Sequence, residues 1–175
     1  MTRRIVLTGP ESTGKTTLAS ALARRFGAPW LPEASRVFAE DVKRELVAAD
    51  ADSIAKRAIR AEDAALADRP PILVLDTDLV STVVYARHYY GACPAWIEAA
   101  ARERRGDLYL LCAPDLPWTA DGVRDRPAHR EEMFALFEGA LQEFGCVSTG
   151  VSGTGPARER AAFTAATAIA AAGYR

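Results

Sequence analysis

Eight consecutive residues, Gly9 to Thr16, have the types and spacing that bind phosphate. They run Gly-Pro-Glu-Ser-Thr-Gly-Lys-Thr and match the pattern G-x-x-x-x-G-K-[ST] at every fixed position. The glycines let successive backbone N–H groups point at an anion, and the helix expected to follow directs its positive end at the same phosphates. The alternative is a glycine turn that merely joins a strand to a helix. We expect this loop to bind a nucleoside triphosphate.

The side chains of the loop predict which atoms hold the nucleotide. Lys15 is expected to reach the β- and γ-phosphates as a point charge, and the Thr16 hydroxyl is expected to bind Mg²⁺. The predicted nucleotide-binding residues are Gly9, Glu11, Ser12, Thr13, Gly14, Lys15, Thr16 and Thr17. ATP and Mg²⁺ are therefore the expected cofactors, although this pattern does not distinguish ATP from GTP.

Acidic residues follow two of the other expected strands. Asp76 ends the apolar run that starts at Ile72, where a P-loop enzyme has an acid close to Mg²⁺. Glu33 follows a short strand and could accept a proton from a substrate hydroxyl or bind a ribose diol, or else only favour the start of a helix. Asp78 is either a substrate ligand or the N-cap of the next helix. Because ligands of parallel sheets bind at the carboxyl ends of strands, these acids should face the loop.

Basic and aromatic residues supply further candidates. Arg36 lies one turn after Glu33 and either pairs with it or meets a phosphate. Arg124 and Arg126 fall in a charged segment, about residues 116–130, that we expect to be a lid carrying arginines onto the transferred phosphoryl group; the alternative is a solvated loop. Tyr89 and Trp118 could stack on a base, although an aromatic stripe at helical spacing more often belongs to a core.

The elements that must position these residues alternate between strands and helices, which predicts an α/β fold with a parallel sheet of about five strands. Expected strands are Arg4–Thr8, Ala28–Leu31, Ile72–Asp76, Asp107–Cys112 and Cys146–Thr149. Expected helices are Lys15–Phe26, Ala34–Ala49, Asp52–Asp68, Leu79–Tyr90, Pro94–Arg104, Glu131–Phe144 and Ala157–Ala172. The length of 175 residues favours one domain, residues 1–175.

Composition narrows the function classes. The net charge of −1 provides no basic field for nucleic acid or an anionic membrane, so neither is an expected partner. Three dispersed cysteines and two histidines argue against structural zinc and a disulfide framework. The first strand begins too close to Met1 for a signal peptide, which favours a cytoplasmic location. The oligomeric state is left open.

Taken together, the motifs resemble the ribosylnicotinamide kinase domain of the NadR type, within the P-loop nucleoside and nucleotide kinases. The matching residues are Gly9, Glu11, Ser12 and Gly14–Thr16; Glu33, Arg36 and Phe38; Asp76–Asp78 and Thr82; Tyr89 and Gly91; and Pro117, Trp118, Asp121, Gly122 and Arg124. The resemblance implies a fold like that of deoxynucleoside kinases and phosphorylation of the 5′-hydroxyl of nicotinamide riboside.

Carried over by position, the resemblance implies Lys15 and Thr16 at ATP and Mg²⁺, Asp76 at the metal or the hydroxyl, and Arg124 and Arg126 in the lid. The predicted catalytic residues are Lys15, Asp76, Glu33, Arg124 and Arg126, with either Asp76 or Glu33 as the base and with Thr16 and Asp76 as the metal ligands. Glu33, Arg36, Asp78, Tyr89 and Trp118 would bind the acceptor nucleoside. The leading hypothesis is therefore an ATP-dependent small-molecule kinase acting on a nucleoside. The alternatives are a nucleotide-dependent switch or regulatory ATPase, a kinase for another nucleoside or nucleotide, and a kinase for nucleic-acid ends.

Overall fold

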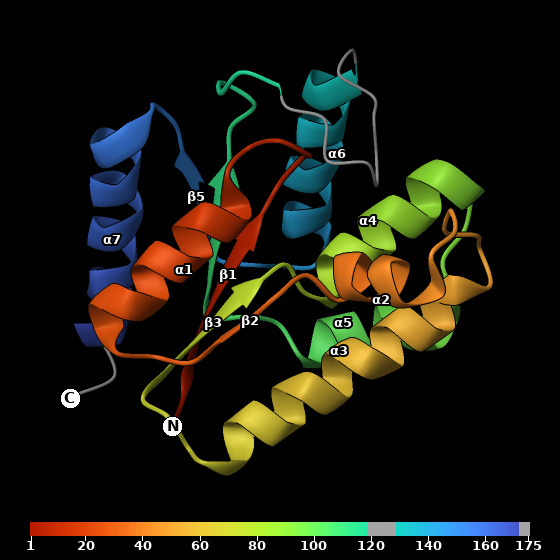
Figure 1. Cartoon of the computed structure of the whole chain (residues 1–175), viewed down its shortest axis with the longest axis horizontal. Coiled ribbons are helices and arrows are strands. Elements are labelled where there is room, and N and C mark those ends of the chain that lie inside the picture. The colour runs from red at the N-terminus through yellow and green to blue at the C-terminus, as the bar shows by residue number, and fades with distance from the viewer. Residues whose placement is uncertain (119–128, 172–175) are drawn as a thin grey trace.

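A parallel sheet organises the molecule in the computed structural model, which describes residues 1–118 and 129–171 (Figure 1). Its strands are β1 (Arg3–Thr8), β2 (Trp30–Leu31), β3 (Ile72–Asp76), β4 (Leu108–Cys112) and β5 (Ser148–Val151), in the spatial order β2-β3-β1-β4-β5. All four pairings are parallel, and Leu7 of β1 lies opposite Asp76 of β3. The phosphate-binding loop and the acid that ends β3 therefore emerge side by side, as expected.

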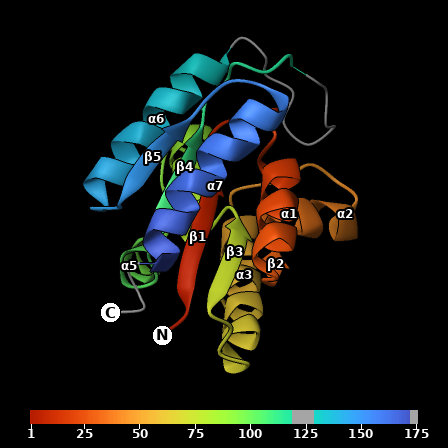
Figure 2. The same cartoon turned by 90° about the vertical axis from the view of Figure 1, so that its left-hand side faces the viewer.

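Helices cover both faces of this sheet. They are α1 (Lys15–Phe26), α2 (Ala34–Val42), α3 (Asp50–Ala67), α4 (Leu79–Tyr90), α5 (Ala95–Glu103), α6 (Arg130–Glu143) and α7 (Gly155–Ala171). Figure 2 shows α1 and α7 together on one face, with α3, α5 and α6 behind the sheet. The strands β1, β3 and β4 are apolar and largely buried, as such a three-layer arrangement requires.

Alternation along β1 divides the core into two clusters. Ile5 and Leu7 pack on the side of α1 and α7, whereas Val6 packs on the side of α3 to α6. All three are fully buried. This two-sided burial fixes the register of β1, because a shift of one residue would exchange the two sets of side chains. The phosphate-binding loop is thus anchored to the most buried part of the molecule.

Several element boundaries differ from expectation, most of them by one or two residues, and the end of α2 differs most. The helix expected over Ala34–Ala49 ends at Val42, because Lys43 takes a left-handed conformation with φ of 53° and closes the helix. The last strand is Ser148–Val151, two residues later than expected, because its ladder with β4 runs from Ser148 to Val151. In the described ranges, 1–118 and 129–171, no helix is both long and apolar enough to span a bilayer.

Candidate active site

The turn after β1 has the backbone of an anion-binding nest. Gly9 and Gly14 have φ of 123° and 74°, and Ser12 between them has φ of 52°. A Cβ on Gly9 would lie 2.7 Å from the carbonyl oxygen of Cys112, so only glycine permits β1 and β4 to approach this closely. The loop then enters α1 at Lys15, with Gly14 as the N-cap. Both glycines of the motif are therefore required by geometry.

Two side chains of the loop fold back onto its own backbone. The Lys15 ammonium donates to the carbonyl oxygen of Pro10 at 2.6 Å, and the Thr13 hydroxyl donates to the same oxygen at 2.9 Å. Lys15 and Thr13 are both buried, and Thr16 and Thr17 at the start of α1 are exposed. The ammonium of Lys15 is thus held over the loop, where a triphosphate oxygen could replace the Pro10 carbonyl as its acceptor.

Thr16 and Asp76, the two expected metal ligands, are hydrogen-bonded to each other. The Thr16 hydroxyl donates to Oδ2 of Asp76 at 2.5 Å. Among the described residues, Asp76 Oδ1 is buried and has no hydrogen-bond partner. A buried carboxylate oxygen without a donor is costly unless a ligand completes it, and a hydroxyl beside a carboxylate is an oxygen set that Mg²⁺ accepts. These two residues therefore fit the expected ion.

The charges around Asp76 show which groups share its environment. Burial raises the pKa of Asp76, and the nearby Glu33 carboxylate raises it further. Hydrogen bonding from Thr16 and the positive charges of Lys15 and Arg36 oppose this rise. Glu33 and Arg36, both on the segment that follows β2, thus lie close enough to influence Asp76 electrostatically. The structure brings together the acids at the ends of β2 and β3, as the sequence predicts.

A strained turn separates Asp76 from Asp78. Thr77 has φ of 69°, which is unfavourable for a residue with a branched side chain and is typical of functional sites. The turn sends Asp76 toward the phosphate-binding loop, and it leaves Asp78 to cap α4 by accepting from the backbone N–H of Val80 at 3.0 Å. The N-cap interpretation of Asp78 is therefore confirmed.

Asp78 also has a buried partner that the motifs did not indicate. The Tyr109 hydroxyl donates to Oδ2 of Asp78 at 2.5 Å and accepts from the Gly106 N–H at 3.1 Å. Burial raises the pKa of Asp78 to about 6, although the bond from Tyr109 lowers it. The only signal in the sequence is a tyrosine within an otherwise apolar strand, since a buried hydroxyl needs a partner.

A cavity of about 740 Å³ opens beside Asp78, between the segment after β2 and helices α3 and α4. Glu33, Asp78 and Tyr89, three of the residues expected to bind the acceptor, line it. The cavity walls also include Tyr85 and Tyr90 and the apolar residues Leu31, Val37, Leu46, Val47 and Ile54. Its volume is in the range that holds a ligand the size of a nucleoside.

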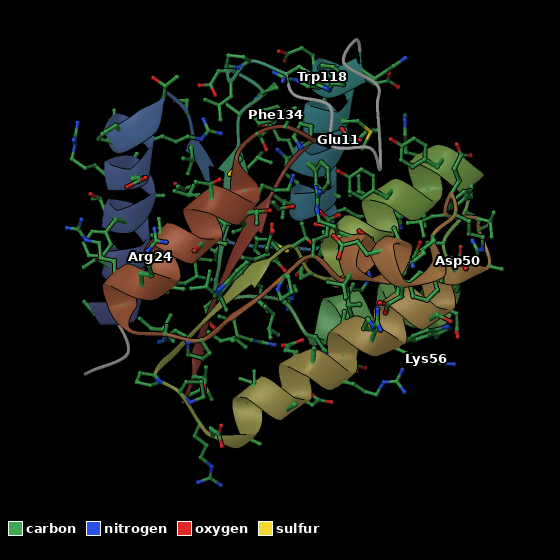
Figure 3. The ribbon with its side chains drawn as sticks, in the orientation of Figure 1. Glu11, Arg24, Asp50, Lys56, Trp118 and Phe134 are labelled. Atoms are coloured by element: carbon green, nitrogen blue, oxygen red, sulfur yellow. The ribbon has the colours of Figure 1, made fainter. Side chains whose placement is uncertain are left out.

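Glu11 connects the phosphate-binding loop to this cavity. Its Oε1 accepts from the Tyr89 hydroxyl at 3.1 Å, so a residue of the loop holds a residue of the cavity wall. Figure 3 shows Glu11 at the carboxyl end of the sheet, and Asp50 at the start of α3. The two halves of the predicted site are therefore contiguous.

Some predicted site residues lie elsewhere or outside the described residues. Trp118 is exposed, and Arg36 is half-buried; neither is among the residues that line the cavity. Arg124 and Arg126 lie outside the described residues. The segment before them does approach the phosphate-binding loop, since a Cβ on Gly14 would lie 3.0 Å from Leu116. Sequence reasoning placed Trp118 on the acceptor, but the described cavity does not include it.

A phosphate-binding loop on the central strand of a parallel sheet, beside an acid on the next strand, defines a P-loop nucleoside triphosphate-binding protein of the kinase type. Residues 4–160 match the family model described as AAA domain. The chain therefore belongs to the AAA domain family.

Comparison with curated proteins finds the trifunctional NAD biosynthesis/regulator protein NadR of Escherichia coli (strain K12). It is 32% identical over 147 residues, which are 81% of this chain and 36% of that protein. The chain thus spans about a third of the length of this relative.

Solved structures confirm the P-loop kinase fold. A crystal structure of NadR protein in complex with NR has a TM-score of 0.78 at 24% identity and covers 97% of this chain and 50% of its own. A second, in complex with NAD and AMP-PNP, has a TM-score of 0.76 with the same identity and coverage. Thymidylate kinase from Ehrlichia chaffeensis has a TM-score of 0.63 at 13% identity and covers 96% and 98% of the two chains.

Proposed function

We propose that this protein is an ATP-dependent kinase that phosphorylates the 5′-hydroxyl of nicotinamide riboside. The donor side of the proposal is supported by the phosphate-binding loop and by a NadR structure that contains AMP-PNP. The acceptor side is supported by the 32% identity to NadR and by the structure of NadR with NR. The observation that carries the choice of acceptor is the charge of the cavity.

Carboxylates outnumber cationic groups in the described cavity wall. Glu33, Glu45, Glu62 and Asp78 line it, and Arg57 is the one basic residue of the lining. Arg57 is paired with Asp41, which does not line the cavity, at 2.6 Å. Glu62 is neutralised from behind by Arg4 and Arg104 at 2.9 and 3.2 Å. The other carboxylates of the lining, those of Glu33, Glu45 and Asp78, add negative charge to the cavity wall.

These three carboxylates favour a positively charged acceptor. A carboxylate about 8 Å from a cation contributes roughly 2 kcal/mol at an effective dielectric constant of about 20. The rings of Tyr85, Tyr89 and Tyr90 line the same cavity, and aromatic faces also attract cations. Nicotinamide riboside carries a positive charge on its pyridinium ring, whereas the common nucleosides are neutral. The cavity thus fits this acceptor better than an uncharged nucleoside of equal size.

Residue roles follow from position in this proposed site. Lys15 binds the β- and γ-phosphate oxygens, while Thr16 and Asp76 hold Mg²⁺, which supplies positive charge to the triphosphate. Glu33 lies on the cavity wall and within electrostatic range of Asp76, so it accepts the proton of the attacking hydroxyl. The hydroxyl oxygen forms a bond to the γ-phosphorus as the bond to the β-γ bridging oxygen breaks. Arg124 and Arg126 are proposed to contact the transferred group.

The acceptor is tested by ADP release across a panel of nucleosides at saturating ATP and Mg²⁺. The panel contains nicotinamide riboside, its uncharged dihydro form, cytidine, uridine and thymidine. We expect kcat/KM for nicotinamide riboside to exceed that of every neutral nucleoside by about tenfold or more, because about 1.4 kcal/mol corresponds to a factor of ten. A neutral nucleoside used equally well would refute the choice of acceptor while leaving kinase chemistry intact.

A further inference from the structure

Arg158 of α7 lies buried behind the phosphate-binding loop, with 4% of its surface exposed. Its Nη2 donates to the carbonyl oxygens of Thr13 at 2.9 Å and Ala113 at 3.0 Å. Its Nη1 donates to Oδ1 of Asp115 at 2.7 Å and to the carbonyl oxygen of Gly153 at 3.0 Å. One guanidinium group thus joins the phosphate-binding loop to the segments that follow β4 and β5.

The contact with Thr13 acts on the phosphate side of the loop. A trans peptide is planar, so its carbonyl oxygen and the following N–H point in opposite directions. No cis peptide is present in the described residues, and holding the Thr13 oxygen toward Arg158 therefore turns the Gly14 N–H away from it. That direction leads to the inside of the nest, where a phosphate oxygen accepts. Arg158 thereby orients the Gly14 N–H, a backbone donor, toward the phosphate.

Asp115 compensates the positive charge of the buried Arg158 guanidinium. It pairs with Arg158, and its second oxygen accepts from the Gly153 N–H at 2.6 Å. Burial works against the charged form of Asp115, but the bonds from Gly153 and Arg158 keep its pKa below the usual value. Asp115 therefore stays ionised at neutral pH, and the whole cluster acts as one rigid support.

We propose that Arg158 is a positioning residue of the triphosphate site, which holds the Thr13–Gly14 peptide in the orientation that binds phosphate. The inference rests on the proposed function only in that the loop binds a nucleoside triphosphate; it is independent of the acceptor. Because Arg158 is not among the described residues that line the acceptor cavity, its effect belongs to the donor side.

Two substitutions separate positioning from simple charge. Arg158→Lys keeps a positive charge, but its single ammonium cannot reach four acceptors on three segments. Arg158→Met removes the charge and keeps much of the side-chain volume. If only the electric field of Arg158 mattered, the lysine variant would bind ATP like the unsubstituted protein. If Arg158 instead positions the Thr13–Gly14 peptide, both variants should lose affinity for ATP.

The experiment is isothermal titration of MgATP into each protein, followed by KM measurements for ATP and for the acceptor. We expect Kd for ATP to rise about tenfold or more in Arg158→Met and about threefold in Arg158→Lys, as for the loss of hydrogen bonds from a charged donor. KM for the acceptor should change by less than about twofold. Should the methionine variant not fold, the lysine variant carries the same test.

Arg87→Met is the matched control. Arg87 bridges Glu98 and Glu143 at 2.9 and 2.7 Å, away from the phosphate-binding loop, and its loss should lower the melting temperature without changing Kd for ATP. If the Arg158 variants lose stability but bind ATP normally, Arg158 is merely structural and the proposal is wrong. If the unsubstituted protein does not bind ATP, the proposed function itself has failed.

Discussion

Asp76 and Asp78 are separated by one residue and serve different halves of the site. Asp76 shares a hydrogen bond with Thr16 of the phosphate-binding loop, whereas Asp78 lines the acceptor cavity. The left-handed Thr77 makes this division possible, because it reverses the backbone between the two carboxylates. Their environments also differ: Asp78 accepts from Tyr109 and from the start of α4, while one oxygen of Asp76 accepts no hydrogen bond from any described residue.

This difference predicts that kcat/KM for the acceptor depends on the protonation of Asp78. Burial raises its pKa to about 6, so its carboxylate gains a proton as the pH falls through that value. We expect kcat/KM for the acceptor to decline about tenfold per unit below pH 6. In Tyr109→Phe the carboxylate loses a donor that lowers its pKa, and the decline should therefore begin at a higher pH.

The control for this assignment is Asp78→Asn, which retains an N-cap for α4 but cannot titrate. Its kcat/KM should be lower at pH 8 and nearly independent of pH between 5 and 7. A decline that keeps its midpoint in Tyr109→Phe would assign the titration to another group, with Asp76 the first candidate, because burial raises the pKa of that residue as well.

The site residues could be predicted from the sequence where the pattern that reveals them is local. The phosphate-binding loop is a contiguous motif, and Asp76 was found because it ends an apolar strand. The contacts of Tyr109 with Asp78 and of Arg158 with Thr13 join residues 31 and 145 positions apart, and no spacing rule relates them. Buried polar side chains acquire partners only when tertiary structure forms, so these two positioning contacts required the structure.

At the scale of elements, the connection between α2 and α3 was the least predictable segment. A helix was expected to continue to Ala49, but Lys43 ends it and the chain folds back. Arg44 donates to both oxygens of Asp50 at 2.7 and 2.8 Å, and the Val47 N–H donates to Asp50 Oδ2 at 2.9 Å. We call this Arg44–Asp50 pair the clamp. Helix propensity alone does not predict it, since the clamp depends on a side-chain contact across the turn.

The clamp shapes the acceptor cavity, because Leu46 and Val47 lie between Arg44 and Asp50 in the sequence and line the cavity wall. In Asp50→Asn the bidentate pair with Arg44 is lost, and we expect KM for the acceptor to rise by up to about fivefold, since one partner is exposed. KM for ATP should stay unchanged. Steady-state kinetics in both substrates measure this, and an equal rise for ATP would contradict a local role.

Asp50 should also make unfolding depend on acid. The bond from Arg44 holds its folded pKa at about 2, below the usual value of 3.8, although burial opposes this shift. Its contribution to stability is therefore complete above pH 3.8 and disappears as the pH falls through about 2. Thermal unfolding of the parent chain and Asp50→Asn should thus converge toward pH 2; a constant difference would exclude this pair as the cause.

At the scale of the molecule, the strand order explains why a donor and an acceptor site meet. The central strand β1 carries the phosphate-binding loop, and its neighbour β3 ends in Asp76. Strand β2, on the other side of β3, ends two residues before Glu33. Apolar runs and their alternation with helices predicted this parallel sheet correctly. The order of strands and the cavity between α3 and α4 are tertiary properties that required the structure.

The central claim is that phosphate reaches a nucleoside and is not simply released to water. The most direct test incubates the protein with ATP, Mg²⁺ and nicotinamide riboside and quantifies ADP and nicotinamide mononucleotide by mass spectrometry, with Lys15→Ala in parallel. We predict that the two products form in equal amounts, and that Lys15→Ala, which loses the ammonium held over the loop, forms neither above about 1% of that rate. ADP formed without the mononucleotide would contradict the account and indicate an ATPase.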